Sequence, residues 1–534
     1  MKTPQNEVVL NYAPNSTEKK LLQKAIEEAK SVEKDIPMYI GNEEIRTEDK
    51  RRLAMPHEHA HTLGYCHFGD EYHVGQAIRA ALNAKASWGK FTRDQRGRIF
   101  LKAAELAAGP YRMKLNAATM LGQSKNAYQA EIDAACELID FLRFNVHFME
   151  EMELIQPASS AGVNNQLEYR PLEGFVFALT PFNFTAIAAN LPTAPAMLGN
   201  VVVWKPAETQ IYAAQVIMEL LIEAGLPAGV INLIYTEGPV AGEVIFNHPE
   251  FAGLHFTGST KVFKSLWKII ANNLDTYKNF PRIVGETGGK DFVLAHPSAN
   301  PKEVATALVR GAFEYQGQKC SAASRAYLPV SLWEQIKTFV LEDLAAIKMG
   351  TVEDFGNFVN AVIDEKAFDR IVAAIELAKK DPLMKVIAGG TYDKSVGYFI
   401  APTILQTIDP CSTTMTEELF GPVLTVYIYP DNTFKDVLHL VDTSSPYALT
   451  GAIFSADRAV LENAKEVLQH AAGNIYLNDK PTGAVVGQQP FGGGRMSGTN
   501  DKSGSMLNLL RWVTPRTVKE TFVSPKDFRY PFLG

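Results

Sequence analysis

Short apolar runs alternate with helix-forming stretches between residues 174 and 258. The apolar runs cover residues 175–179, 201–204, 230–234 and 253–256. This repeated order of strand, helix and strand predicts a parallel, doubly wound sheet with right-handed crossovers. Ligands of such sheets bind at the carboxyl ends of the strands. We therefore expect loops 182–183, 205–208 and 257–259 to form a binding edge.

A second alternating pattern covers residues 290–473, with predicted helices at 301–313 and 331–348 and predicted strands at 326–329 and 424–429. A chain of 534 residues is too long for one core, so this region should form a second α/β domain. Residues 72–152 are mostly helical in pattern and should cover a sheet. Near the start, Ser16 is placed to cap a helix whose apolar positions run from Leu21 to Val32.

Composition narrows the class of protein. Hydrophobic residues make up 46% and charged residues 21% of the chain, which is ordinary for a globular enzyme and argues against disorder. The net charge of -7 argues against a nucleic-acid partner. No apolar run is long enough for a signal peptide or a membrane span. The four cysteines are widely spaced without CxxC pairs, which fits free thiols in a reducing compartment.

Three histidines, His57, His59 and His61, suggest a metal site at first sight. They lie in a polar segment beside Pro56, without carboxylate or cysteine ligands at a familiar spacing. We therefore predict no metal.

One cysteine lies in a segment suited to chemistry. Cys320 follows the polar run Gln316-Gly317-Gln318-Lys319, and Glu286 lies upstream among glycines. A thiolate adds readily to an aldehyde carbonyl, and a nearby carboxylate can activate the water that later releases the acyl group. Each residue alone has a plain alternative, because many cysteines are unreactive small hydrophobes and a glutamate among glycines can cap a turn.

Further motifs accompany these two residues in a characteristic order. They are Thr180-Pro181-Phe182-Asn183-Phe184, Trp204-Lys205-Pro206-Ala207-Glu208, Phe256-Thr257-Gly258-Ser259-Thr260 and Glu417-Glu418-Leu419-Phe420-Gly421-Pro422-Val423. With these motifs the chain resembles the aldehyde dehydrogenase superfamily from about residue 38 to its C-terminus. Within that superfamily, segments 313–322, 478–480, 487–493 and 497–502 resemble the pyrroline-5-carboxylate dehydrogenase branch.

The resemblance implies an α/β fold with a Rossmann-type NAD-binding domain, an α/β catalytic domain and a small β oligomerisation arm. We assign residues 1–152 and 171–287 to the NAD-binding domain, with a helical extension at its N-terminus. Residues 288–484 form the catalytic domain, and residues 153–170 and 508–534 form the arm. A homodimer or a larger homo-oligomer is expected.

The resemblance also implies NAD as the cofactor. The residues carried over for NAD binding are Lys205, Ala207, Glu208, Gly258, Ser259, Thr260, Lys261, Val262, Glu418 and Phe420. Segment 258–260 can direct backbone amides at a pyrophosphate from a helix N-terminus. Phe263 stands where many relatives carry a glycine, which leaves the pose of the pyrophosphate open. The carboxylate of Glu208 would repel a 2′-phosphate and favours NAD over NADP.

In the implied reaction Cys320 is the nucleophile and Glu286 activates the hydrolytic water. The Asn183 side-chain amide and the Cys320 backbone amide stabilise the oxyanion. Asn183 could instead be a simple turn residue after Pro181.

Seven positions match residues that hold glutamate semialdehyde in the family. Lys319, Ser321, Gly483 and Ala484 correspond to the carboxylate-binding end, Phe184 and Phe491 flank the methylenes, and Glu137 matches an active-site carboxylate. Many relatives have serine at position 484, so one hydroxyl contact is lost while the backbone amide remains. Glu137 has the alternative of a solvated helical residue.

The predicted function is NAD-dependent oxidation of L-glutamate γ-semialdehyde, the open form of 1-pyrroline-5-carboxylate, to L-glutamate in proline catabolism. The alternatives are a dehydrogenase of another carboxylated aldehyde such as succinate semialdehyde, a CoA-acylating enzyme and a catalytically silent homologue. A CoA-acylating enzyme would not need Glu286. Transient contact with a proline dehydrogenase is expected. The first 40 residues contain no arginine, so we predict a bacterial cytoplasm, or the mitochondrial matrix for a mature eukaryotic protein.

Overall fold

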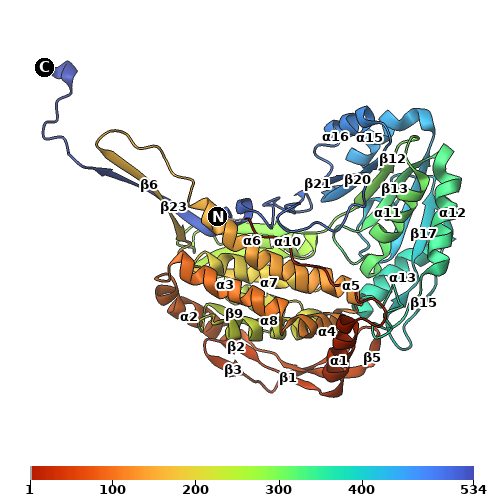
Figure 1. The fold of residues 1–534 in the computed structure, drawn as a ribbon, viewed down its shortest axis with the longest axis horizontal. Coiled ribbons are helices and arrows are strands. Elements are labelled where there is room, and N and C mark those ends of the chain that lie inside the picture. Colours follow the sequence, from red (N-terminus) through yellow and green to blue (C-terminus); the bar gives the residue numbers. More distant parts are fainter. Residues whose placement is uncertain (1–2) are drawn as a thin grey trace.

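The computed structural model describes residues 3–534. It contains two seven-stranded sheets with their helices, and a two-stranded arm that projects from the body (Figure 1).

The first sheet has the strand order β11-β10-β7-β8-β9-β2-β3. Its parallel strands are β7 (Phe175–Thr180), β8 (Val202–Pro206), β9 (Ile231–Leu233), β10 (Phe251–Thr257) and β11 (Arg282–Glu286). The antiparallel strands β2 (Met38–Ile40) and β3 (Glu43–Ile45) complete one edge. β7 and β8 are buried along almost their whole length, which explains their continuous apolar sequence. The parallel sheet predicted from the alternation is confirmed.

The helices around this sheet come mostly from the N-terminal third of the chain and from the crossovers. They are α2 (Glu71–Trp88), α3 (Arg93–Ala108), α4 (Arg112–Gln123), α5 (Ala127–Ala130), α6 (Glu137–Met152), α7 (Thr185–Met197), α8 (Ile211–Ala224), α9 (Gly238–Phe246) and α10 (Thr260–Asn272). A π-helical turn, η1 (Glu131–Cys136), joins α5 to α6. The first helix, α1 (Thr17–Ser31), begins after Ser16, whose Oγ accepts a hydrogen bond from the Lys19 amide at 3.2 Å. The predicted cap is confirmed.

The second sheet has the order β14-β17-β18-β13-β12-β20-β21, and only β14 runs antiparallel to its neighbour. Its strands are β12 (Asp291–Ala295), β13 (Ala323–Pro329), β14 (Met384–Ala388), β17 (Thr403–Thr407), β18 (Val423–Tyr429), β20 (Thr450–Phe454) and β21 (Asn474–Leu477). The accompanying helices are α11 (Pro301–Phe313), α12 (Val330–Ala346), α13 (Glu365–Lys380), α14 (Thr413–Thr416), α15 (Phe434–Thr443) and α16 (Arg458–Val467). Two short pairs, β15 (Tyr392–Asp393) with β16 (Phe399–Ile400) and β19 (Tyr447–Ala448) with β22 (Gly494–Arg495), lie outside it.

Residues 34–67 follow the N-terminal helix α1. This segment forms strands, and β1 (Lys34–Ile36), β4 (Lys50–Met55) and β5 (Glu58–His67) make a separate three-stranded sheet. His57, just before β5, is buried, and its Nδ1 lies 3.2 Å from the Ser124 hydroxyl. Within residues 3–534, the His, Cys, Asp and Glu side chains form no group of three or more that could hold a metal ion. The same part of the chain has no helix long and apolar enough to cross a membrane.

The arm consists of β6 (Val163–Pro171) paired antiparallel with β23 (Val513–Thr521), and Figure 1 shows it extending away from both sheets. Its predicted start at residue 508 needs correction. Residues 508–513 include α17 (Met506–Leu509), and Leu509 and Trp512 are fully buried in the core of the first domain. The freely projecting part therefore starts after this apolar anchor.

Candidate active site

Cys320 lies in a tight turn between α11 and β13. Before it, Tyr315 and Gln316 adopt left-handed φ angles of 50° and 55°. Such angles cost a non-glycine residue about 1 to 3 kcal/mol and persist where the surroundings hold them. Here the Gln316 side chain donates to the carbonyls of Ser124 (3.0 Å) and Ala361 (2.8 Å). The turn is thus held by contacts from two other parts of the chain.

A cavity of about 400 Å³ contains Cys320. The expected catalytic and substrate residues that line it are Glu286, Lys319, Ser321, Gly483, Ala484, Phe184, Phe491 and Glu137. They come from both domains and from the connection between β21 and β23. The structure therefore brings together residues that are up to several hundred positions apart in the sequence.

The Cys320 thiol is in an environment that favours its neutral form. Burial raises its pKa well above the ordinary value, and the carboxylates of Asp291, Glu418 and Glu286 raise the pKa further. The thiol must therefore lose its proton to a base before it can act as a nucleophile.

Glu286 ends strand β11, at the carboxyl edge of the first sheet. Burial raises its pKa well above the ordinary value, although a hydrogen bond from the Gly493 amide to Oε2 at 3.3 Å acts in the opposite direction. A buried carboxyl group with a raised pKa is suited to taking a proton near neutral pH. Among the hydrogen bonds of residues 3–534, the Glu286 side chain accepts from the Gly493 amide and from no amide of the turn that directly follows it.

Asn183 lies between β7 and α7 and is buried, but it does not line the cavity. Its Nδ2 donates a hydrogen bond to the Gln318 carbonyl at 2.9 Å. This bond ties the loop after β7 to the segment that carries Cys320. A primary amide carries two hydrogens, so one remains for another acceptor.

A cluster of charged residues surrounds Lys319 at the side of the cavity. Its Nζ lies 3.5 Å from Asp133 Oδ2 and 3.6 Å from Glu314 Oε2. Burial acts to lower the pKa of Lys319, but these two carboxylates outweigh it and the pKa is raised. Lys319 is therefore positively charged, and its ammonium group is already paired with the carboxylates of Asp133 and Glu314.

The segment after β21 forms the rim of the cavity. Ser321 Oγ and Thr482 Oγ1 lie 2.8 Å apart, which joins this segment to the cysteine turn. Gly483 has a φ of +95°, and a Cβ atom there would lie 2.7 Å from the Lys480 Nζ. The position thus requires glycine on conformational grounds.

Glu137, the first residue of α6, is half-buried and faces the same cavity. Burial raises its pKa well above the ordinary value, and Asp133 raises it further. The alternative of a solvated helical residue is wrong.

The expected cofactor residues lie along the carboxyl edge of the first sheet. Gly258 donates its amide to the Glu286 carbonyl at 3.1 Å, and the Ser259 Oγ accepts from the Val262 amide at 3.3 Å as the N-cap of α10. The α10 N-terminus, with Thr260 and Lys261 in its first turn, can direct backbone amides towards an anion. Lys205 is buried in β8 one residue before the strand ends at Pro206, and Ala207 and the exposed Glu208 follow.

Phe263 occupies the space over Gly285. A Cβ atom at Gly285 would lie 2.2 Å from the Phe263 ring, and this ring stacks on Phe256 with centroids 5.3 Å apart. The aromatic residue that departs from the family pattern is thus a core residue, 7% exposed, below the first turn of α10.

Glu418 lies against the glycine pair that follows Glu286. Its Oε1 accepts a hydrogen bond from the Gly289 amide at 2.8 Å, and burial raises its pKa to about 7. A Cβ atom at Gly288 would lie 2.2 Å from Glu418 Oε2, so this approach requires glycine. Phe420 has a φ of 51°, and its ring contacts that of Phe182 edge-on.

The sequence patterns did not indicate several residues that line the cavity. Asn6, Glu7 and Val9 come from the N-terminal segment, Asp133 from the π-helical turn η1 and Asp140 from α6. Nothing in the N-terminal sequence resembles a binding motif. Its relevance arises from contacts with residues more than a hundred positions away.

The chain matches the aldehyde dehydrogenase family over residues 45–518, and it belongs to that family. This confirms the resemblance drawn from the motifs. The chain is 51% identical to the mitochondrial delta-1-pyrroline-5-carboxylate dehydrogenase of Dictyostelium discoideum, over 99% of this chain and 96% of that protein.

Solved structures agree with this similarity. The Delta-pyrroline-5-carboxylate dehydrogenase from Mycobacterium tuberculosis, in a crystal structure bound with NAD, is 49% identical with a TM-score of 0.97. That comparison covers 100% of this chain and 99% of the other. Proline utilization A from Bdellovibrio bacteriovorus is 30% identical with a TM-score of 0.92, over 98% of this chain and 54% of that protein.

Proposed function

We propose that this enzyme oxidises L-glutamate γ-semialdehyde, the hydrolysed form of 1-pyrroline-5-carboxylate, to L-glutamate with NAD as the oxidant. The cavity carries this proposal. It places the Cys320 thiol and the Glu286 carboxylate in one space with a rim, Gly483 and Ala484, that can present backbone amides to a carboxylate. The relatives named as pyrroline-5-carboxylate dehydrogenases support the same substrate.

The first step is addition of Cys320 to the aldehyde. The thiol transfers its proton to a base, the carbon–sulfur bond forms, and the electron pair of the carbonyl moves onto its oxygen. The Cys320 backbone amide and the remaining hydrogen of the Asn183 amide are the donors assigned to that oxygen. Loss of one such donor typically costs about 3 kcal/mol of transition-state stabilisation.

The α10 N-terminus, Glu208 and Glu418 would hold NAD, which would supply the acceptor for the hydride of the former aldehyde carbon. Cys320 then carries the acyl group as a thioester. Glu286 takes a proton from a water molecule, the water oxygen attacks the acyl carbon, and the carbon–sulfur bond breaks to release the acid. The raised pKa of Glu286 makes it a stronger base than an exposed glutamate once it is ionised.

The residues at the carboxyl edge of the first sheet fit NAD. The α10 N-terminus suits a pyrophosphate, and Glu208 at the end of β8 suits ribose hydroxyls while disfavouring a 2′-phosphate. We assign Glu418 and Phe420 to the nicotinamide side, because Glu418 is near enough to raise the pKa of Cys320.

We further propose that the arm pairs with a second copy of the chain in a homodimer or larger assembly. Phe522 and Val523 directly after β23 are 64% and 81% exposed, which is the type of surface that a partner covers. We also propose transient contact with a proline dehydrogenase, since this chain matches 54% of the longer proline utilization A chain. The cytoplasm of a bacterium, or the mitochondrial matrix of a eukaryote, remains the predicted location, and the Dictyostelium relative is named mitochondrial.

A panel of aldehydes assayed for NADH or NADPH formation tests the function. We expect the highest kcat/KM for glutamate semialdehyde with NAD, followed by succinate semialdehyde and then by neutral aldehydes such as propanal. A preference for succinate semialdehyde or propanal would contradict the proposed substrate, and activity only with NADP would contradict the cofactor.

A further inference from the structure

The N-terminal segment is built into the wall of the active-site cavity. We define residues 6–12 as the N-terminal strap. Asn6, Glu7 and Val9 of the strap line the cavity that contains Cys320. None of them takes part in the reaction described above.

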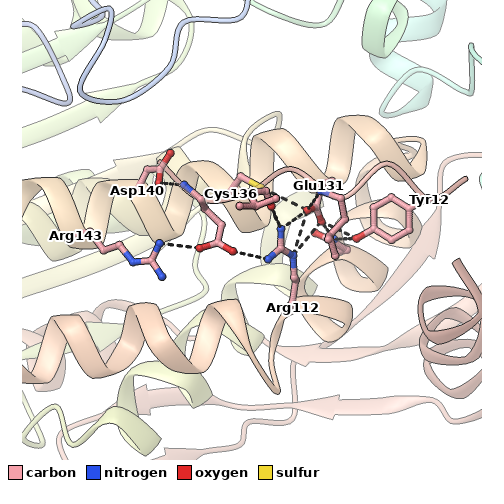
Figure 2. Close-up of polar contacts among 10 residues, drawn as sticks. Tyr12, Arg112, Glu131, Cys136, Asp140 and Arg143 are labelled. Atoms are coloured by element: carbon pink, nitrogen blue, oxygen red, sulfur yellow. Dashed lines mark hydrogen bonds and ion pairs between the residues drawn. The ribbon is translucent and has the colours of Figure 1, made fainter. Parts of the chain in front are cut away.

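Buried side chains anchor the strap at several points. Glu131 is fully buried in the π-helical turn, and it accepts hydrogen bonds from the Leu10 amide (2.9 Å) and the Tyr12 hydroxyl (2.6 Å). Arg112 pairs with Glu131 and donates to Glu7 Oε1 at 2.7 Å. Figure 2 shows Arg112 and Tyr12 converging on Glu131. Although burial acts to raise the pKa of Glu131, the bonds from Arg112 and Tyr12 lower it, so the anchor stays charged.

Asn6 connects two walls of the cavity. Its Nδ2 donates both to Asp140 Oδ2 on α6 and to the Val486 carbonyl, each at 2.8 Å. Its Oδ1 accepts from Gln488 Nε2 at 2.9 Å. Both hydrogens of the Asn6 Nδ2 are thus donated, and together they join α6 to the loop that begins at Gly483.

Internal hydrogen bonds make that loop compact from Val485 to Gln489, and Ala484 directly precedes this compact part. The amides of Gln488 and Gln489 donate to the Val485 carbonyl at 3.0 and 2.9 Å, and Gln489 Oε1 accepts from the Val485 amide at 2.9 Å. On its other side the loop rests on α6, because a Cβ atom at Gly487 would lie 2.2 Å from the Phe144 ring.

We propose that Asn6 is a positioning residue for substrate recognition. Its bonds to the Val486 carbonyl and to Gln488 hold loop 483–489 so that the backbone amides of Gly483 and Ala484 contact the substrate carboxylate. The inference rests on the proposed function. It assigns to the strap control over the preference for a carboxylated aldehyde, with no part in the chemistry at Cys320.

Asn6→Ala tests this inference, with Asn11→Ala as the matched control. Asn11 belongs to the same strap, is exposed, and its side chain bonds only to the nearby Ala13 amide among the contacts of the described residues. For Asn6→Ala we expect a KM for glutamate semialdehyde raised about fivefold or more, from the loss of the hydrogen bonds to Asp140, Val486 and Gln488. The kcat, and kcat/KM for propanal, should stay within about twofold. Asn11→Ala should match the wild type with both aldehydes.

A charge swap provides the second arm of the test. Asn6→Asp places a carboxylate against Asp140 and the Val486 carbonyl, and should raise the KM for glutamate semialdehyde more than Asn6→Ala. Adding Asp140→Asn restores a donor and acceptor pair between the two positions and should recover part of the loss. A merely structural effect would not be rescued in this way.

Hydrogen exchange measures the loop directly. In Asn6→Ala the peptide covering residues 484–489 should exchange faster, while the peptide covering 316–321 should not change. Equal losses for both aldehydes, or an unchanged KM with an unchanged loop, would overturn the inference. If the wild-type enzyme itself has no preference for glutamate semialdehyde over propanal, the proposed function fails and the inference fails with it.

Discussion

The two ends of the active-site cavity are held in different ways. At the cysteine end, left-handed residues and side-chain bonds to the backbone fix a turn, as Gln316 does with Ser124 and Ala361. At the rim, loop 483–489 packs on Phe144 of α6, and on its outer side the Asn6 side chain bonds to the Val486 carbonyl and to Gln488. A rigid chemical centre and a separately supported rim allow substrate preference to change while the chemistry is retained.

This difference predicts two classes of variant. Changes at the cysteine end should affect every aldehyde alike, because each one passes through the same thiol addition. Changes at the rim should affect carboxylated aldehydes selectively.

The largest effect is expected for Cys320→Ser, because a serine hydroxyl is not ionised near neutral pH and is a far weaker nucleophile than a thiolate. Turnover of glutamate semialdehyde and of propanal should each fall at least about a thousandfold, as in other enzymes that lose their nucleophile. NAD binding, measured by calorimetry, should stay nearly unchanged. Cys411→Ser at an exposed free cysteine is the control and should retain full activity. Appreciable turnover by Cys320→Ser would contradict the assigned mechanism.

The next effect concerns Glu286→Gln, which keeps the shape of the side chain but cannot accept a proton. Thioester hydrolysis should slow more than hydride transfer, so rapid mixing should show a burst of about one NADH per site and then a slow steady rate. Both aldehydes should show the burst. Its absence, with acylation itself lost, would mean that Glu286 also takes the proton of the thiol.

A smaller and selective effect is expected at the rim. Ala484→Pro removes a backbone donor, and hydrogen bonds to a charged group contribute about 1.5 to 3 kcal/mol. The kcat/KM for glutamate semialdehyde should therefore fall about tenfold to a hundredfold, with less change for propanal. Ala484→Gly, which keeps the amide, is the matched control. Its kcat/KM for glutamate semialdehyde should lie between those of the wild type and Ala484→Pro. Equal losses for both aldehydes would indicate general damage to the loop, and no loss for either would mean that the loop does not bind the carboxylate.

The same contrast explains what could be predicted from the sequence. The strands around residues 175–179 and 201–204 are buried in a parallel sheet, so they consist of continuous apolar runs that can be recognised in the sequence. Cys320 and Glu286 lie in glycine-rich motifs whose residues pack against each other in the folded chain. Each of these two residues could be predicted because its motif is contained within a few residues of the sequence.

Residues 34–67 were not predicted as strands. β1, β2 and β3 have only three residues each, and the longer strands β4 and β5 carry many polar residues and no regular alternation of buried and exposed positions. Asn6 was missed for a different reason. Its partners Asp140 and Val486 are 134 and 480 positions away, so only the folded chain brings them together. Contacts of this kind have no local pattern.

The smallest predicted effect is a pH dependence of stability at the cysteine end. Burial raises the pKa of Glu418 from 4.5 to about 7, so the folded protein retains a proton there that the unfolded chain has lost. The contribution of this group to stability is therefore complete below pH about 4.5 and is lost as the pH rises through about 7. Such a shift corresponds to at most about 3 kcal/mol, or a few degrees in Tm for a chain of this size.

Glu418→Gln is neutral at every pH and keeps an acceptor for the Gly289 amide, so its Tm relative to the wild type should rise by about 2 to 3 °C between pH 5 and pH 8. Glu417→Gln, at the exposed neighbouring position, controls for the loss of a carboxylate from this loop. A Tm difference between Glu418→Gln and the wild type that does not change with pH would contradict this prediction. It would show that ionising Glu418 costs the folded enzyme no more free energy than it costs the unfolded chain.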